Sequence, residues 1–137
     1  MKTTIMVTCK DNTSATARTG EVVLTYSNGT KSLKCTVKQD AGKKAEVGTT
    51  TFSEITKNSA KATASYTSDF PVTVYGFYYS KTNTTPGEND MKVELTGSDK
   101  SGSFSATLTG LKSGSKYYVR AYANNGVGYS YGEVTTI

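Results

Sequence analysis

The sequence predicts an all-β protein made of short strands. Apolar and polar residues alternate along most of the chain with the two-residue period of a half-buried strand, and no long stretch has the 3.6-residue period of a helix. Of the 137 residues, 24 are Thr and 15 are Ser, and Thr favours a pleated surface over a helix. Gly, Asn and Ser separate the alternating segments, as expected of turns between strands.

Three strands are predicted in the first part of the chain. They cover Thr4–Cys9, Gly20–Tyr26 and Ser32–Lys38. Ser27–Thr30, between the last two, contains an Asn-Gly pair, which readily supplies the positive φ angles of a tight turn. The second and third strands should therefore form a hairpin.

A polar linker is predicted to divide the chain. Asp40–Glu46 is rich in charged residues and contains no strand formers, so it is expected to connect two modules rather than to join a sheet. We place a small β module at residues 1–41, the linker at 42–46 and a second domain at 47–137.

The second domain has the strand pattern of an immunoglobulin-like sandwich. About seven short strands in about 90 residues, separated by Gly, Asn and Ser, are typical of two packed antiparallel sheets. The strands are predicted over Thr50–Ile55, Ala60–Thr67, Val72–Ser80, Met91–Leu95, Gly102–Leu108, Tyr117–Asn124 and Tyr129–Thr136.

Within this domain, three segments resemble fibronectin type III domains. Residues 108–128 resemble the family pattern Leu-x-Pro-Gly-Thr-x-Tyr-x-Val-Arg followed by Ala-x-Asn-x-x-Gly, with Ser113 and Ser115 in place of Pro and Thr. Residues 76–80 resemble strand C of bacterial members of the family, and residues 128–134 resemble their strand G. The resemblance covers the whole second domain and implies a fibronectin type III sandwich.

The same resemblance implies a tyrosine corner, in which Tyr117 buries its ring and its hydroxyl bonds to the backbone near Leu111. Both residues would then be structural. Animal members of the family usually carry a Trp in strand B, which is missing here. We expect Tyr66 or its neighbours to fill that space.

The first module resembles the C-terminal half of BACON domains, which are immunoglobulin-like modules of exported proteins from gut-type bacteria. The resemblance rests on the region of Asn12, on Arg18–Thr25 and on Val37–Gly42. Three strands can hardly bury an independent core, and an unpaired strand edge invites pairing with another chain. This incomplete module is therefore expected to dock on the second domain, to swap between chains or to be loosely ordered.

Two cysteines lie in the predicted strands of the first module. Cys9 and Cys35 alternate in register with the apolar residues of their strands, so both are predicted to face the apolar side of one small sheet. They could form a disulfide or remain buried thiols, and either role is structural.

Composition excludes several functions. The chain has no His, which removes Ser-His-Asp triads, Cys-His pairs and His-ligated zinc. The net charge is only +5, and no run of basic residues exceeds Lys43-Lys44, so no nucleic-acid partner is expected. No apolar run approaches the ~18 residues of a membrane span, so this fragment is not expected to insert into a membrane.

Acidic residues gather between positions 88 and 94. Glu88, Asp90 and Glu94, with Asn89, could offer oxygen ligands to Ca²⁺, but their spacing matches no calcium-binding pattern. Paired carboxylates that hydrolyse glycosides need a pocket and a fixed separation, which the sequence does not indicate. We therefore predict no catalytic residue, no metal and no cofactor.

The main candidate site is a stripe of tyrosines on one face of the second domain. If Tyr117, Val119 and Ala121 face inward, their neighbours in the strand face outward on one side. The outward residues of three adjacent strands would then form the stripe. Its predicted members are Tyr78, Tyr118, Arg120, Tyr122 and one of Tyr129 and Tyr131, of which we take Tyr131.

Two interpretations of the stripe are open. Exposed tyrosine rings could stack on sugar rings, with Arg120, Asn124 and Asn125 as polar partners. Alternatively, the tyrosines form a cross-strand ladder that stabilises the sheet. The loops Ser80–Asp90 and Asn124–Gly128 are the other places where a sandwich could bind a partner.

Taken together, these features predict a non-catalytic structural spacer, or a protein-interaction and adhesion module, of an exported bacterial surface protein. The alternative is a carbohydrate-binding accessory module that uses the tyrosine stripe. The expected partners are neighbouring domains of the same protein, and polysaccharide or a surface protein. We expect an extracellular, cell-surface or periplasmic location. Because Met1 leads directly into a strand pattern, we also expect the chain to be a segment of a longer protein.

Overall fold

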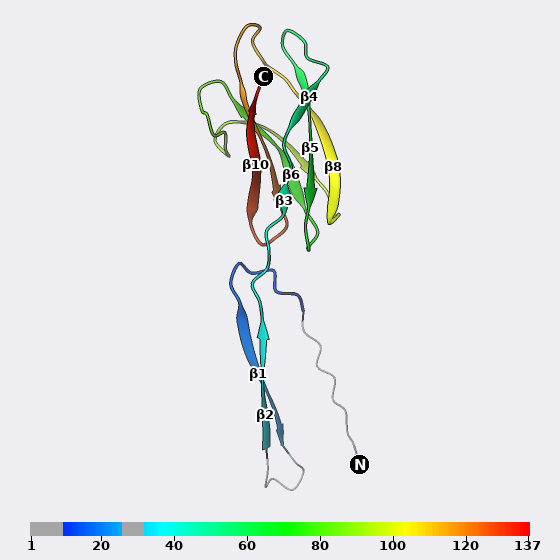
Figure 1. Ribbon diagram of the computed structural model, residues 1–137, viewed down its shortest axis with the longest axis vertical. Helices are drawn as coiled ribbons and strands as arrows, with labels where there is room; N and C mark the ends of the chain where they lie inside the picture. The colour runs from blue at the N-terminus through cyan, green and yellow to red at the C-terminus, as the bar shows by residue number, and fades with distance from the viewer. Residues whose placement is uncertain (1–9, 26–31) are drawn as a thin grey trace. The chain divides into compact units, whose positions relative to one another are not determined.

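The computed structural model describes residues 10–25 and 32–137. All regular secondary structure in these residues consists of antiparallel β-strands. None of those residues belongs to a helix that could cross a membrane. The chain divides into two compact units, residues 1–42 and 43–137, drawn in Figure 1. The all-β prediction is confirmed.

Within residues 10–25 and 32–42, the first unit forms a two-stranded sheet. Strand β1 (Arg18–Thr25) pairs with β2 (Ser32–Gln39) in a regular antiparallel register along their full lengths. This is the pairing that the Asn-Gly turn predicts. The turn itself, Ser27–Thr30, and the predicted strand Thr4–Cys9 lie outside the described residues.

A buried asparagine connects the loop before β1 to the segment after β2 by hydrogen bonds. Asn12 donates through Nδ2 to the backbone oxygens of Thr16, at 2.8 Å, and of Asp40, at 2.7 Å. The Gly42 N–H donates to the Ser14 carbonyl at 2.7 Å. Because Asn12 is only 5% exposed, its bonds replace water that the side chain has lost, and they hold the loop before β1 against the segment after β2.

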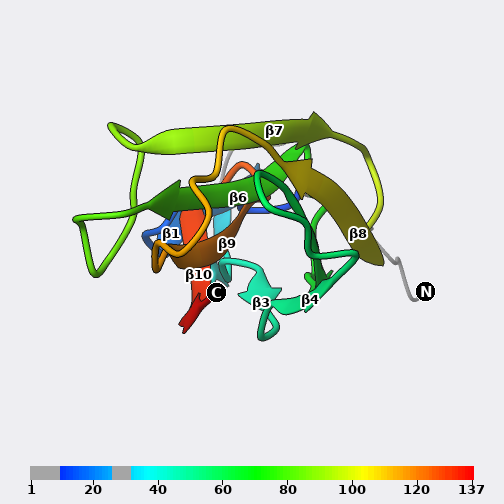
Figure 2. The same cartoon turned by 90° about the horizontal axis from the view of Figure 1, so that it is seen from above.

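The second unit is a sandwich of two sheets, which Figure 2 shows from above. One sheet has the strand order β10-β9-β6-β7. In the other, β5 is central, with β8 along one side and the two short strands β3 and β4 along the other. The strands are β3 (Glu46–Val47), β4 (Thr51–Ser53), β5 (Ala60–Thr67), β6 (Val74–Ser80), β7 (Met91–Thr96), β8 (Ser101–Leu108), β9 (Tyr118–Asn124) and β10 (Tyr129–Thr136).

The seven strands predicted for this unit are all present, and β5 and β10 have the predicted bounds. Strand β3 was not predicted, because Glu46 and Val47 follow a polar stretch without an alternating pattern. Ala45, placed in the linker by the sequence, is 5% exposed and belongs to the core of the second unit. A single Ala between charged residues carries too little apolar pattern to reveal this packing.

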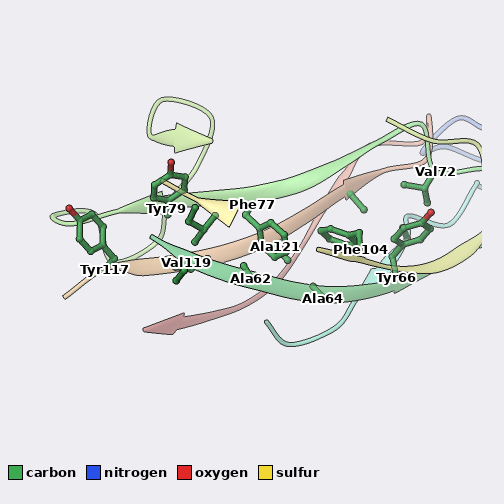
Figure 3. Packing of buried hydrophobic residues seen from close by; sticks show 14 of the residues in the cluster. Ala62, Ala64, Tyr66, Val72, Phe77, Tyr79, Phe104, Tyr117, Val119 and Ala121 are labelled. Atoms are coloured by element: carbon green, nitrogen blue, oxygen red, sulfur yellow. The ribbon is translucent and has the colours of Figure 1, made fainter. Parts of the chain in front are cut away.

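Small residues on β5 face large aromatic residues on the opposite sheet and on β8. Ala60, Ala62 and Ala64 are almost fully buried, and they leave room for a ring cluster centred on Phe104 (Figure 3). The Phe104 ring lies 5.0 Å from Phe77, 4.9 Å from Tyr75 and 6.0 Å from Tyr66, measured between centroids. Tyr66 on β5 is 5% exposed, so it occupies core volume, as expected for a residue that takes the place of the missing strand B Trp.

Asn125 anchors the start of the second unit. This side chain is 3% exposed, and its Nδ2 donates to the Lys43 carbonyl at 2.7 Å and to Ser68 Oγ at 2.9 Å. Its Oδ1 accepts from the Val127 N–H at 3.2 Å. Asn125 therefore ties the entering chain to the β5–β6 and β9–β10 loops, and it is not free to bind a ligand.

Tyr117 connects the segment before β9 to the preceding loop. Its ring is 4% exposed, and its Oη accepts a hydrogen bond from the Lys112 N–H at 3.1 Å. Leu111, the residue before Lys112, is 9% exposed and packs in the same core. This is the geometry of a tyrosine corner.

We expect the Tyr117→Phe substitution to lower the free energy of unfolding by about 1–2 kcal/mol, because it leaves the Lys112 N–H without its acceptor. Urea unfolding of both proteins measures the difference. Tyr118→Phe, at the half-buried neighbouring residue, is the matched control and should unfold like the wild type. An unchanged midpoint for Tyr117→Phe would contradict the role of this hydroxyl.

Candidate functional site

The candidate site is the outer face of the β10-β9-β6-β7 sheet. On β6, Phe77 and Tyr79 belong to the core cluster, whereas Tyr78 between them does not. On β9, Val119 and Ala121 belong to that cluster, and Tyr122 does not. The alternation of each strand therefore places Tyr78 and Tyr122 on the side away from the core.

Tyr78 and Tyr122 form a stacked pair on this outer face. Their ring centroids are 4.1 Å apart and their planes differ by 15°. Although the face is turned away from the core, Tyr78 is only 3% exposed and Tyr122 is 0% exposed. The pair is therefore buried, as it would be in a second, smaller core.

Gly76 makes room for this pair. It lies directly opposite Tyr122 on β9 and Glu94 on β7. A Cβ on Gly76 would be 2.0 Å from the Val93 carbonyl oxygen and 3.1 Å from Tyr122 Oη. A strand Gly often marks such a close approach, and here it lets the Tyr122 side chain reach across β6 toward β7.

The hydroxyl of Tyr122 lies next to an ion pair on β7. Its Oη donates to Glu94 Oε2 at 3.2 Å, and Lys92 Nζ approaches the same oxygen at 3.3 Å. Burial, together with the negative charge of Glu94, raises the pKa of Tyr122. The polar end of a buried tyrosine is thus satisfied at the sheet edge.

The Tyr78 hydroxyl also resists ionisation. Burial raises the pKa of Tyr78 to about 12, and neighbouring tyrosines and the carboxylates of Glu88 and Glu94 add to this shift. Both stacked tyrosines therefore remain neutral at physiological pH.

The β10 strand supplies the outer rim of the cluster. Tyr131 lies 6.4 Å from Tyr78 and Tyr129 lies 6.1 Å from Tyr122, between ring centroids. The Arg120 guanidinium carbon is 3.9 Å from the centroid of the Tyr131 ring, which is a cation–π contact. Tyr129 and Tyr131 are 42% and 43% exposed, so the rim is the accessible part of the cluster.

Tyr118 is placed apart from the others. It lies opposite Ser80 on β6 and Thr136 on β10, and Lys116 Nζ is 5.2 Å from its ring centroid. In the described part of the chain, no ring contact joins Tyr118 to the stacked pair.

The structure brings together four of the five predicted stripe residues, Tyr78, Arg120, Tyr122 and Tyr131, and also Tyr129, the alternative to Tyr131. It adds two residues from outside the predicted stripe, Gly76 and Glu94. A Gly inside a strand pattern is a signal for Gly76. No sequence signal pointed to Glu94, because only the register of β6 with β7 and β9 places its carboxylate at the Tyr122 hydroxyl.

This geometry is that of a cross-strand ladder. A sugar platform needs accessible ring faces, but the facing sides of Tyr78 and Tyr122 are covered by each other. One face of Tyr131 is covered by Arg120. The cluster chiefly packs the outer side of the sheet.

The acidic β6–β7 loop is held by its own hydrogen bonds. Asp90 Oδ2 accepts from Asn83 Nδ2 at 2.7 Å and from the Gly87 N–H at 3.0 Å. Burial acts to raise the pKa of Asp90, but these bonds, with a contribution from Ser80, lower it overall. The described residues contain no group of three or more side chains placed to hold a metal ion.

One hollow in the second unit has two carboxylates in its lining. Glu46 and Asp69 line a space of about 150 Å³ next to Lys43. Lys43 Nζ lies 2.8 Å from Glu46 Oε1, and this hydrogen bond lowers the pKa of Glu46. A glycosidase acid needs a raised pKa, so Glu46 has the opposite character.

Cys35 differs from its predicted environment. It is exposed and its thiol is free, whereas the sequence placed it on a buried apolar face. In the described residues, β1 and β2 form a two-stranded sheet, and Val22 and Val37 border an open groove of about 330 Å³ on it. Cys9 lies outside the described residues.

Comparison with known proteins agrees with the two parts of the fold. Residues 1–40 match the BACON family, described as "Putative binding domain, N-terminal". The chain is similar in structure to domains d3–d4 of the extracellular region of rat CD45, with a TM-score of 0.53 and 15% sequence identity. This match covers 99% of the present chain and 69% of that one. No match was found among curated proteins.

The second unit has a fibronectin type III-like sandwich fold. A BACON-like segment precedes it. The BACON resemblance drawn from the sequence is confirmed for residues 1–40, and the structural likeness confirms the predicted sandwich fold.

We expect Gly76→Ala to destabilise the fibronectin type III-like domain by about 1–3 kcal/mol, because the new methyl group would overlap the Val93 carbonyl and force the strands apart. Thermal or urea unfolding measures this loss. Gly87→Ala is the matched control, since a Cβ there meets nothing within 4 Å. Equal midpoints for the two variants would contradict the close approach.

The stacked pair also predicts a loss of stability in alkali. The pKa of Tyr78 is about 12 in the folded domain and close to 10 for an unfolded tyrosine. Because the folded pKa is the higher one, the stabilising contribution is complete below about pH 10 and is lost as the pH rises toward 12.

The test compares urea unfolding of wild type and Tyr78→Phe at several pH values. Phe keeps the stacked ring and removes the ionisation, so the variant should lose less stability than wild type between pH 10 and 12. Parallel pH profiles for the two proteins would show that Tyr78 ionises as easily in the folded domain as in the unfolded chain.

Proposed function

We propose that this chain is a non-catalytic structural module, a spacer that connects neighbouring domains of an exported bacterial surface protein. Domains of the BACON and fibronectin type III kinds are generally non-catalytic. The match of residues 1–40 to BACON supports an extracellular, cell-surface or periplasmic location, because the sequence resembles modules of exported proteins.

The observation that carries this proposal is the burial of the stacked tyrosines. Tyr78 and Tyr122 are 3% and 0% exposed, so the aromatic area that a glycan would use is already occupied inside the protein. Aromatic burial and cross-strand contacts of this kind stabilise a sheet. A reinforced sheet is what a spacer requires, since it must remain folded between its neighbours.

A carbohydrate-binding accessory function is the second candidate. The exposed fractions of Tyr129 and Tyr131, 42% and 43%, favour it, because a partly open ring can stack on a sugar. Arg120, held over Tyr131, could add a hydrogen-bond donor. Binding there would be weak, since the two buried rings cannot contribute.

An amide NMR titration of the ¹⁵N-labelled chain with plant and host oligosaccharides tests the proposal. A spacer should show no saturable shifts at millimolar sugar. Saturable shifts at Arg120, Tyr129 and Tyr131 would overturn the spacer in favour of a carbohydrate module. The double variant Tyr129→Ser with Tyr131→Ser should abolish such shifts, whereas Tyr118→Ser, outside the cluster, should retain them.

A further inference from the structure

Strand edges are the places where a sheet can pair with another chain, and most edges of the second unit are protected. Edge strands that stay monomeric are usually short, charged, bulged or covered. The β3 and β4 edge consists of strands of two and three residues. The β7 edge carries Lys92 and Glu94, whose charges oppose pairing with a further strand.

The β10 edge is protected in two ways. Its register with β9 shifts between Tyr131 and Val134, which is a bulge that disrupts a regular edge. Gly132 also lies against the chain that follows β3, because a Cβ on Gly132 would be 2.6 Å from the Gly48 carbonyl oxygen.

The β8 edge is neither short, nor charged, nor bulged. Strand β8 runs for eight residues, Ser101–Leu108, without a charged residue or Pro. It pairs with β5 in an unbroken register from Ser101 to Leu108. In the described part of the chain, β5 is the strand that β8 pairs with, and β8 lies at the outer side of its sheet in both overall views (Figures 1 and 2).

The side chains of β8 suit a further antiparallel neighbour. Its odd-numbered residues are exposed Ser and Thr, and Phe104 and Leu108 are buried. Across the existing pair, Thr63 and Ser105 already share a hydrogen bond of 2.8 Å between their hydroxyls. Such Ser and Thr pairs stabilise neighbouring strands, and the same chemistry is available on the free side of β8.

We propose that β8 pairs antiparallel with β8 of a second copy of this chain, so that the two β5-centred sheets become one continuous sheet. This partner is chosen because the strand pattern is unchanged when its direction is reversed. Pairing about Phe104 places Ser101 opposite Thr107 and Ser103 opposite Ser105. These partners lie on the same face, as strand pairing requires, and no like charges meet.

Self-association of this kind goes beyond the spacer function. It would join copies of the surface protein side by side through backbone hydrogen bonds. It uses residues on the sheet opposite the tyrosine cluster, so sugar binding and self-association can fail or succeed independently.

Sedimentation equilibrium of the whole chain, from micromolar to millimolar concentration and with a reducing agent, tests the proposal. We expect the mass to rise from 14.6 kDa toward twice that value as the concentration increases. Hydrogen exchange should show amides of residues 101–108 becoming protected over the same range.

Ser105→Lys should weaken the association by about tenfold or more, because the pairing brings the two lysines close together. Ser105 is exposed, so the variant should keep the amide spectrum of a folded domain. Ser53→Lys, exposed on the opposite edge of the same sheet, is the matched control and should associate like wild type.

Three results would overturn the proposal. The first is a mass of 14.6 kDa at millimolar concentration. The second is association that Ser105→Lys leaves unchanged. The third is concentration-dependent protection confined to residues 18–39, which would assign the contact to the β1–β2 hairpin instead.

Discussion

The packing of Tyr122 across Gly76 determines what the outer face of the larger sheet can do. Without a side chain at Gly76, the Tyr122 ring crosses β6 and its hydroxyl reaches Glu94 on the edge strand. Tyr78 then stacks on that ring at 4.1 Å. A residue with a Cβ at position 76 would meet the Val93 carbonyl, so the missing side chain is a condition for the whole cluster.

Because of this cluster, the β10-β9-β6-β7 sheet is packed on both faces. Its inner face holds Phe77 and Val119 in the main core, and its outer face holds the two stacked tyrosines. Tyrosine suits the outer position because its ring can be buried while its hydroxyl reaches a polar partner. The same residues would be a binding site only if their faces were open, and stacking closes them.

Much of this could be predicted from alternation and turn residues, because those depend on local sequence. The predicted strand Ala60–Thr67 and the outward direction of Tyr78 and Tyr122 are examples. Exposure could not be predicted, since it depends on which side chains from neighbouring strands meet. Only the strand register places Glu94 within reach of the Tyr122 hydroxyl. Ala45 is a single apolar residue between charged residues, so the sequence pattern does not indicate that it packs in the core.

The two sheets of the sandwich differ in which of their surfaces are open to other molecules. The outer face of the larger sheet is covered by aromatic rings, and its edges are bulged or charged. The β5-centred sheet instead ends in β8, a regular and uncharged strand. Backbone groups along such an edge can pair with any strand of suitable pattern. Since a reversed copy of β8 has the same alternation of hydroxyl and apolar residues, this edge suits the self-pairing that we propose.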